Sequence, residues 1–395
     1  MPQYDVRLAV PLASAYFDEL HRRIYFLAEE IEDFAIKRSG GQIVSVRIRT
    51  SIPLDATDLA ERVDRLVRTE ILRQPAAEPT LIWRSPHPAG VVDDTFDRLV
   101  DQGSVLEVGE GQFALGSAFV AAMAYIDAWL SDIALRQFSA LEYRYPTLIS
   151  AEAIRRTGYP SSFPQFLMSV TRLHADSGSY QVFLAELDKG RDLAKATQEH
   201  SRHSGYVLPP TMCFHIYQQL REHRLETGAT AVYTARGKSF RYESRYRQGL
   251  ERLWDFTIRE IVFVGPRDWA VAQRRAFLDA TMRMVEELGL GGHVEVANDP
   301  FFGDAGAAER VVSQRLLHLK YELHLPVAGG RTVAAGSFNV HGTTFSEPFG
   351  IELADGSPAH TSCVGFGLER FTYAFVCRYG TDPAAWPAPA ERRPN

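Results

Sequence analysis

The sequence predicts an α+β fold in which an antiparallel sheet is flanked by helices and preceded by a small α/β extension. Three observations support it. From about residue 239 onward, candidate strands are joined by hairpin-like or irregular loops with one long helix among them. The first part of the chain instead alternates helical and strand-like apolar spacing. The Pro- and Gly-bearing run 85–90 reads as a linker. We therefore expect an N-terminal extension over 1–88 and a main domain over 89–395.

Composition narrows the class of protein. The 395 residues have a net charge of −6 with both signs interspersed, which gives no overall signature of a nucleic-acid binder. Three cysteines, Cys213, Cys363 and Cys377, form no short-range pattern, which suits a reducing compartment. The N-terminus has no basic, apolar leader, and the apolar run Phe119–Leu135 is interrupted by two aspartates, so no stretch is expected to reach transmembrane length. These features predict a soluble cytoplasmic protein.

The N-terminal extension is expected to be a packing or docking module. Apolar residues at helical spacing predict helices over Tyr16–Ile36 and Thr57–Leu72, the second capped by Asp55. Strand-like spacing predicts strands over Gln42–Ile52 and Leu81–Trp83. This part of the chain shows no residue pattern that is typical of a catalytic site.

The main domain begins with a helix, Asp94–Asp101, and a hairpin that turns at Gly109–Gly111. A long helix, Ser117–Arg136, then leads into a strand, Ala140–Tyr145, which ends at Pro146. These elements suit either a subunit interface or internal packing. Strands are predicted at Ser239–Ser244, Asp255–Val264, Val294–Ala297, Leu319–Val327, Thr332–His341 and Ala359–Phe366, and a helix at Pro266–Leu288.

The stretch from Thr361 to Phe371, Thr-Ser-Cys-Val-Gly-Phe-Gly-Leu-Glu-Arg-Phe, predicts a strand that runs into a helix. Glycines at 365 and 367 allow a ligand or another backbone to approach the strand closely. A guanidinium at Arg370 can bind a phosphate or stack on a base. Taken alone, the same pattern also describes a buried strand followed by an ion-paired arginine.

A second pattern places Arg241 and Glu243 before a basic loop and the returning strand Asp255–Val264. The arginine fork suits a phosphate, and the glutamate suits the amino group of adenine. An isolated Arg-x-Glu is more often part of a surface hairpin with ion pairs, so the pattern gains weight only beside the first.

Together the two patterns resemble motifs two and three of class II aminoacyl-tRNA synthetases, and the segment from Ser117 to Pro146 resembles motif one, their dimer-forming element. Within that superfamily the chain resembles the amino acid:[carrier protein] ligases, homologues of the catalytic core of archaeal-type seryl-tRNA synthetases. The resemblance covers about 92–386. It is carried by Val294–Gly303, Lys320–Leu323, Ser337–His341 and His360–Arg370.

Spacing alone does not indicate a metal site, because Cys213 and Cys363 are far apart and a lone cysteine is usually a small buried hydrophobe. The resemblance implies zinc bound by Cys213, Glu260 and Cys363. Two thiolates and a carboxylate leave an open position, which the α-amine of an amino acid can fill. Cys377 is expected in the core, and His341 and His360 in structural roles.

The resemblance also implies an ATP site with Mg²⁺. Arg241 would contact the α-phosphate and Glu243 the adenine, while Arg370 would meet the terminal phosphate or the adenine face. Arg241 and Arg370 are the expected catalytic residues. The remaining expected contacts are Arg252, Leu253 and Lys320 for ATP, and Glu260, Asp299, Ala334, Ala335 and Gly336 for the amino acid.

The implied function is ATP-dependent activation of a small amino acid as an aminoacyl-adenylate, followed by transfer to the phosphopantetheine thiol of a carrier protein, by a homodimer. Two alternatives stay open: a synthetase that charges tRNA, and a catalytically silent paralogue. The acidic balance and the lack of a recognisable tRNA-binding arm make tRNA the less expected acceptor. The segment 340–350 departs from the family pattern, which leaves side-chain specificity and the choice of carrier open.

Overall fold

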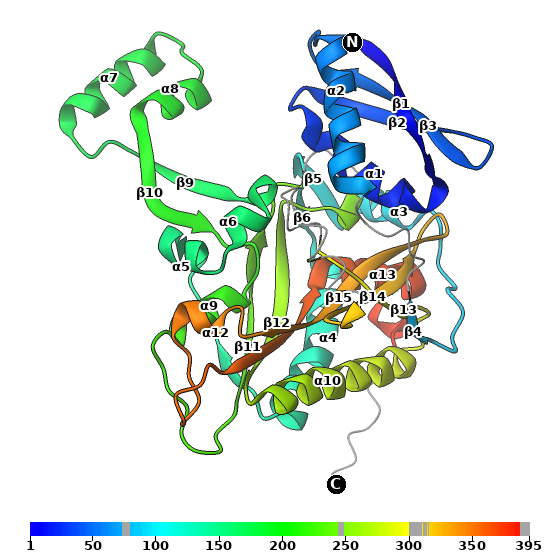
Figure 1. The fold of residues 1–395 in the computed structure, drawn as a ribbon, viewed down its shortest axis with the longest axis vertical. Helices are drawn as coiled ribbons and strands as arrows, with labels where there is room; N and C mark the ends of the chain where they lie inside the picture. Colours follow the sequence, from blue (N-terminus) through cyan, green and yellow to red (C-terminus); the bar gives the residue numbers. More distant parts are fainter. Residues whose placement is uncertain (73–79, 244–248, 300–309, 311–313, 315, 388–395) are drawn as a thin grey trace.

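The computed structural model describes residues 1–72, 80–243, 249–299, 310, 314 and 316–387. At the N-terminus, a three-stranded antiparallel sheet in the order β1-β3-β2 packs against helix α2 (Figure 1). The elements are β1 Gln3–Ala13, α1 Phe17–Arg23, β2 Ile31–Ser39, β3 Gln42–Thr50 and α2 Ala56–Leu66, followed by a π-helical turn at Val67–Ile71. Asp55 caps α2 as predicted, because its side chain accepts from the backbone N–H groups of Thr57 and Asp58.

The predicted helix Tyr16–Ile36 is wrong over most of its length. Helix α1 ends at Arg23, a 3₁₀ turn follows at Ile24–Leu27, and strand β2 begins at Ile31. The apolar residues that suggested helical spacing are divided among these elements. Pairing of β2 along β3 decides the conformation, since tertiary contacts override a local spacing signal.

The main domain is built on an eight-stranded sheet in the order β4-β13-β14-β15-β16-β12-β11-β7. Neighbouring strands are antiparallel except β7 and β11, which run parallel. The strands are β4 Leu81–Arg84, β7 Leu141–Tyr143, β11 Ala231–Phe240, β12 Asp255–Gly265, β13 His293–Val296, β14 Lys320–Val327, β15 Arg331–Gly342 and β16 His360–Gly367.

Six of the predicted strands agree with this sheet to within a few residues. Two differ. The strand expected at Ser239–Ser244 is the end of β11, which stops at Phe240. The strand expected within the N-terminal unit, Leu81–Trp83, is β4 and pairs with β13 at the edge of the large sheet.

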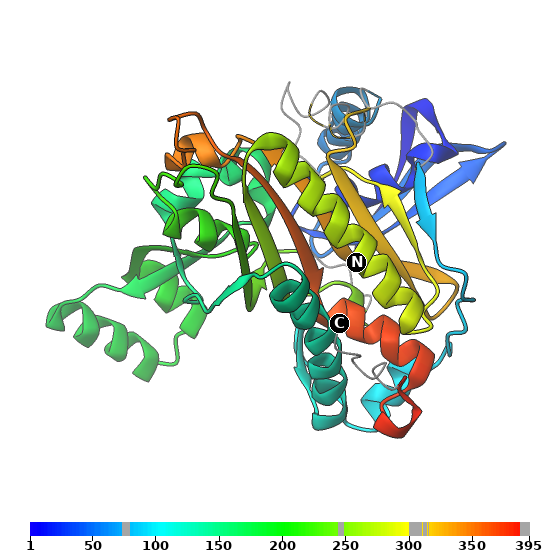
Figure 2. The same ribbon diagram turned by 90° about the horizontal axis from the view of Figure 1, so that it is seen from below.

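Three helices cover one face of the large sheet (Figure 2). They are α4 Ser117–Asp132, α10 Arg267–Glu287 and α13 Leu368–Tyr379. Their apolar side chains and those of the sheet form the largest core, which includes Phe277, Phe338, Phe366 and Cys377 as fully buried residues. The core position of Cys377 confirms the expectation from the sequence.

Helix α4, with the π-helical turn Ile133–Gln137 that follows it, is the one described segment with the length and composition of a membrane span. The sequence analysis expected none, because it counted two aspartates as an interruption. Asp127 in the middle of this helix binds Arg259 of β12 through two hydrogen bonds, of 2.8 and 2.9 Å. Arg259 also donates to Glu142 of β7 at 2.7 Å, so the helix is tied to the sheet as a core helix.

The opposite face of the sheet carries smaller elements. Helix α9 Cys213–Gln219 and helix α12 Ser346–Phe349 pack there in a second core around Tyr217 and Phe349. A helix–hairpin unit, α3 Thr95–Asp101, β5 Val105–Gly109 and β6 Gln112–Leu115, has the predicted turn and packs instead against the largest core, through Leu99 and Val105.

A protruding module lies between β7 and α9 and had no counterpart in the sequence analysis (Figure 1). It consists of β8 Ile149–Ser150, α5 Ala151–Arg156, α6 Tyr159–Ser162, β9 Met168–Leu173, α7 Ser177–Asp188, α8 Leu193–His200 and β10 Ser201–Leu208. Helix α7 has no buried residue, although its sequence places Tyr180, Phe183, Leu184 and Leu187 at helical spacing.

Candidate functional site

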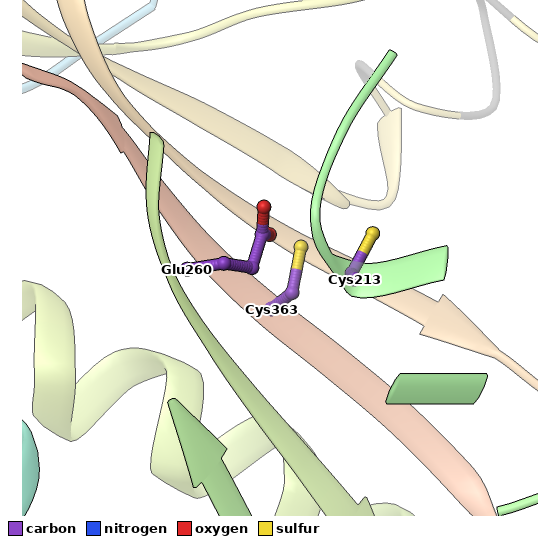
Figure 3. Close-up of side chains that lie close together, drawn as sticks. All are labelled: Cys213, Glu260 and Cys363. Atoms are coloured by element: carbon purple, nitrogen blue, oxygen red, sulfur yellow. The ribbon is translucent and has the colours of Figure 1, made fainter. Parts of the chain in front are cut away.

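Cys213, Glu260 and Cys363 meet on the face of the sheet that is not covered by α10 and α13 (Figure 3). Glu260 lies on β12 and Cys363 on β16, and the antiparallel register pairs Glu260 with Gly365 and Val262 with Cys363. Both side chains therefore point to the same face. Cys213 reaches them from the first residue of α9. The three potential ligand atoms lie within 4.8 Å of one another, as the zinc prediction requires.

The three side chains, hereafter the Cys–Glu cluster, are buried, with exposed fractions of 4%, 2% and 4%. Burial raises the pKa of Glu260 to about 7. The hydrogen bond with Cys213, together with burial, raises the pKa of the Cys363 thiol well above its usual value. The nearby charge of Arg241 offsets the shift of Glu260 only in part, so each shift still disfavours the negative form, and further positive charge would stabilise it. A divalent metal would supply that charge, and two thiolates with one carboxylate suit tetrahedral zinc with a fourth position open.

The loop before Cys213 holds the cluster in place. The Thr211 hydroxyl donates to Glu260 Oε2 at 2.9 Å. The Pro209 carbonyl accepts from the backbone N–H of Phe240, and the Pro210 carbonyl accepts from Arg241 Nε at 3.1 Å. The same short loop therefore contacts both the Cys–Glu cluster and the expected α-phosphate ligand.

His341 and Asn339 also contact Cys363, which the sequence analysis did not predict. His341 Nε2 lies 3.5 Å from Cys363 Sγ, and Asn339 Nδ2 donates to the same sulfur at 3.6 Å. The Tyr217 hydroxyl lies 3.2 Å from His341 Nδ1. Because a thiolate can only accept, the arrangement that satisfies all three groups has Tyr217 donating to Nδ1 and Nε2–H donating to sulfur. Both contacts depend on the register of β15 with β16, which pairs Asn339 with Cys363.

A basic cluster surrounds Glu243 beside the end of β11. Arg252 Nη1 donates to Glu243 Oε2 at 2.9 Å, and Arg370 Nη2 lies 3.6 Å from Oε1. Burial alone would raise the pKa of Glu243, but the charges of Arg252, Arg370 and Arg241 outweigh it and lower the pKa. Burial and repulsion from Arg252 lower the pKa of Arg370 to about 10. Three guanidinium groups near one carboxylate leave an excess of positive charge, which suits a polyphosphate.

The sequence analysis placed Arg241 and Glu243 on a strand. In the structure they lie just beyond β11, which ends at Phe240. Arg241 still donates its backbone N–H to Trp254 O at 3.0 Å, so it continues the hairpin pairing for one residue. Its guanidinium carbon lies 5.4 Å from the centre of the Phe256 ring. Leu253, expected at the nucleotide, is buried in the largest core, which lies between the sheet and helices α4, α10 and α13 and is hereafter called the helix-side core.

Asp299 and Lys320 form an ion pair on the same face of the sheet. Lys320 Nζ lies 2.5 Å from Asp299 Oδ1 and 2.9 Å from Glu322 Oε1. Gln314 Nε2 donates to Asp299 Oδ2 at 2.7 Å. Burial would raise the pKa of Asp299, but the charge of Lys320 outweighs it and holds the pKa below its usual value. Both expected ligands are thus held charged.

The expected lining residues of β15 are divided between the two faces of the sheet. Ala335 is buried in the helix-side core. A Cβ atom at Gly336 would lie 2.8 Å from the Phe366 ring, which belongs to that same core. Ala334 is half-buried and pairs with His324. The residues of this strand that face the Cys–Glu cluster include Asn339, its hydrogen-bonded neighbour Ser337, and His341.

The chain is similar in sequence to known proteins. No family model matches the chain. "Amino acid--[acyl-carrier-protein] ligase 2" of Bradyrhizobium diazoefficiens is 34% identical over 246 residues, which cover 62% of this chain and 71% of that protein. "Amino acid--[acyl-carrier-protein] ligase 1" of the same organism is 30% identical over 305 residues, covering 77% and 91%.

A third relative is the type-2 serine–tRNA ligase of Methanopyrus kandleri, 28% identical over 302 residues that cover 72% of this chain and 56% of that protein. The solved structure of M. kandleri SerRS in complex with A. aeolicus tRNASec superimposes with a TM-score of 0.71 at 23% identity, covering 98% of this chain and 76% of that one. That likeness confirms the predicted class II synthetase-like α+β fold.

We predict that the purified chain retains about one tightly bound zinc ion, and that Cys213→Ala loses it, because two of three protein ligands cannot hold the ion in a buried site. Metal analysis after dialysis without chelator measures this. Cys377→Ala is the matched control and should keep its zinc. Metal-free wild-type protein prepared in this way would contradict the assignment.

We also predict that His341→Ala weakens zinc binding by roughly 10- to 100-fold, because it removes the N–H group that supports the Cys363 thiolate. Competition with a chromophoric chelator measures the affinity without any assay of activity. His360→Ala, at the start of β16, should leave the affinity unchanged. An unaltered affinity in His341→Ala would show that this ring only fills space.

Proposed function

The chain belongs to the family of amino acid--[acyl-carrier-protein] ligases, and from this premise we propose that it activates a small amino acid with ATP and transfers it to the phosphopantetheine thiol of a carrier protein. The observation that carries the proposal is the pairing of two complementary clusters on one sheet face. The buried Cys–Glu cluster suits a metal that takes an amine, and the arginines around Glu243 suit a triphosphate. An amino acid and ATP present those two groups.

Cys213, Glu260 and Cys363 would hold zinc, which when bound offers one position to the neutral α-amine of the amino acid. The chain's own residues then fix the rest of the substrate. Asp299, held charged by Lys320, is an acceptor for the remaining amine hydrogens. With its amine held, the amino acid keeps its carboxylate free to reach the nucleotide.

Adenylation requires that the carboxylate is positioned at the α-phosphorus and that the negative charge of the phosphates is stabilised. A carboxylate oxygen attacks the α-phosphorus, a new P–O bond forms, the bond between the α-phosphorus and the bridging oxygen breaks, and pyrophosphate leaves. Arg241 spreads the charge that develops on the α-phosphate, and Arg370 binds the terminal phosphate. Glu243 accepts from the amino group of adenine. Mg²⁺ bound with ATP would share the charge of the phosphates.

Transfer needs less from the protein because the mixed anhydride is already activated. The pantetheine sulfur attacks the carbonyl carbon, the bond to the phosphate oxygen breaks, AMP leaves, and the thiol proton passes to solvent. No strong base is required for this step. We further propose a cytoplasmic homodimer, with α4 and β7 as the dimer-forming element. Within the extension expected over 1–88, strand β4 belongs to the large sheet, and we propose that the N-terminal sheet with α1 and α2 has no part in adenylation.

We predict that Arg241→Ala and Arg370→Ala each slow amino-acid-dependent pyrophosphate exchange by roughly a hundred- to a thousand-fold, about 2.7–4 kcal/mol, as expected for a lost group that stabilises transition-state charge. Both variants should fold, because each guanidinium lies in a cluster with excess positive charge. Arg275→Ala, an exposed arginine on α10, is the control and should exchange normally. Near-normal exchange in either active-site variant would displace the ATP site from this cluster.

The acceptor is tested by competition. With labelled amino acid, ATP, holo-carrier protein and total tRNA in one tube, the label should accumulate as a thioester on the carrier. Transfer should weaken with added salt, since acidic carriers dock through local charge. Label on tRNA with none on the carrier would instead assign the chain as a tRNA-charging synthetase. Pyrophosphate exchange without transfer to either acceptor would reject both assignments.

A further inference from the structure

A second group of metal-type ligands lies on the paired strands β13 and β14. The register pairs His293 with His324 and Glu295 with Glu322, so all four side chains share one face of the sheet. Val294 and Leu323, the alternate positions, are fully buried in the helix-side core. The face that carries the four is therefore the one that carries Lys320 and the Cys–Glu cluster.

Glu295 faces both imidazoles at once. Its Oε2 lies 3.4 Å from His293 Nε2 and its Oε1 lies 3.5 Å from His324 Nε2. The two rings stack with their centres 5.1 Å apart and an angle of 8° between their planes. One potential ligand atom from each of the three residues lies within 4.8 Å of the others.

These distances are long for hydrogen bonds but suit a shared ion. An N–H···O bond is normally about 2.7–3.2 Å. Two ligands of one tetrahedral zinc ion, at bond lengths of about 2.0–2.2 Å, lie roughly 3.3–3.5 Å apart. In addition, His324 Nε2 is buried and has no hydrogen-bond partner among the described residues, although it lies 3.5 Å from Glu295 Oε1 and 3.6 Å from Glu322 Oε2. An orphaned imidazole nitrogen beside a carboxylate is an available ligand.

A group of similar composition in the protruding module differs from His293, Glu295 and His324 in how its members are bonded. Glu186, Glu199 and His200 also lie within ligand distance of one another. There, Arg191 binds both carboxylates, and His200 Nε2 lies 3.1 Å from Glu186 Oε2 at an ordinary hydrogen-bond distance. That group is satisfied as a salt-bridge network, whereas no arginine or lysine contacts Glu295 among the described residues.

We propose that His293, Glu295 and His324 form a second metal site, distinct from the Cys–Glu cluster, that binds a divalent transition ion such as zinc. Two imidazoles favour such an ion over Mg²⁺ or Ca²⁺, which prefer oxygen ligands. Two histidines and a glutamate leave a fourth position open. Glu322 is not required as a ligand, because Lys320 already binds it at 2.9 Å. The side chains are about one-fifth exposed, so ions exchange more readily here than at the buried cluster.

The test is a titration of the full-length protein with Zn²⁺ and with Co²⁺, following bound equivalents and the cobalt absorption spectrum. Wild-type protein should take up a second, weaker equivalent beyond the one held by the cysteines. His293→Gln with His324→Gln should lose that equivalent and keep the cobalt–thiolate absorption. Cys213→Ala should lose the thiolate absorption and keep the histidine-dependent equivalent. His223→Gln, an exposed histidine elsewhere, should change neither.

Two results would overturn the site: saturation of wild-type protein at one equivalent, or a second equivalent that persists in the double variant. Glu295→Gln provides an independent variant, and it should also lose the second equivalent. Zinc-edge absorption spectroscopy on the wild type covers the case of a misfolded variant, because the average coordination should change from sulfur-rich to mixed sulfur and nitrogen as the second ion binds. An unchanged sulfur-rich shell would exclude the site. Neither result depends on the proposed function, which fails separately if no adenylate forms.

Discussion

The pairing of β12 with β16 is the constraint on which the rest of the site depends. This register sets Glu260 opposite Gly365 and Val262 opposite Cys363, and so directs a carboxylate and a thiol to the same face. A Cβ atom at position 365 would lie 3.4 Å from the carboxylate oxygens of Glu260, in van der Waals contact with them. Glycine at 365 thus keeps the approach to Glu260 open. A slip of one residue would turn Cys363 into the helix-side core.

Two regions of this sheet face have opposite electrostatic needs. Two thiols and a carboxyl group are buried together, and the pKa values of Glu260 and Cys363 are raised, which disfavours their charged forms. Beyond the loop 209–213, three arginines surround one glutamate. Burial and the charge of Arg252 lower the pKa of Arg370. The first region gains from a bound cation and the second from a bound anion. Because Arg241 and Glu260 are both tied to that loop, the two regions have a fixed relation.

The sequence predicted the sheet better than its surroundings. Strands β12, β14 and β16 and helix α10 carry long, uninterrupted spacing signals, and the structure has them nearly where they were expected. The prediction for Tyr16–Ile36 failed because strand pairing with β3 overrides helical spacing. The protruding module was not predicted, although Tyr180, Phe183, Leu184 and Leu187 of α7 stand at helical spacing. The Cys–Glu ligands were found by resemblance alone. The roles of His341, Asn339 and the pair His293–His324 depend on strand register, which residue spacing does not encode.

Anomalous diffraction at the zinc edge, from crystals grown with a stable analogue of the aminoacyl-adenylate, tests the central claim most directly. The account predicts a zinc peak enclosed by Cys213 Sγ, Cys363 Sγ and the Glu260 carboxylate, with the amine of the analogue as the fourth ligand and its phosphate at Arg241. A Cys–Glu cluster without metal, together with an analogue bound away from Arg241 and Arg370, would contradict it.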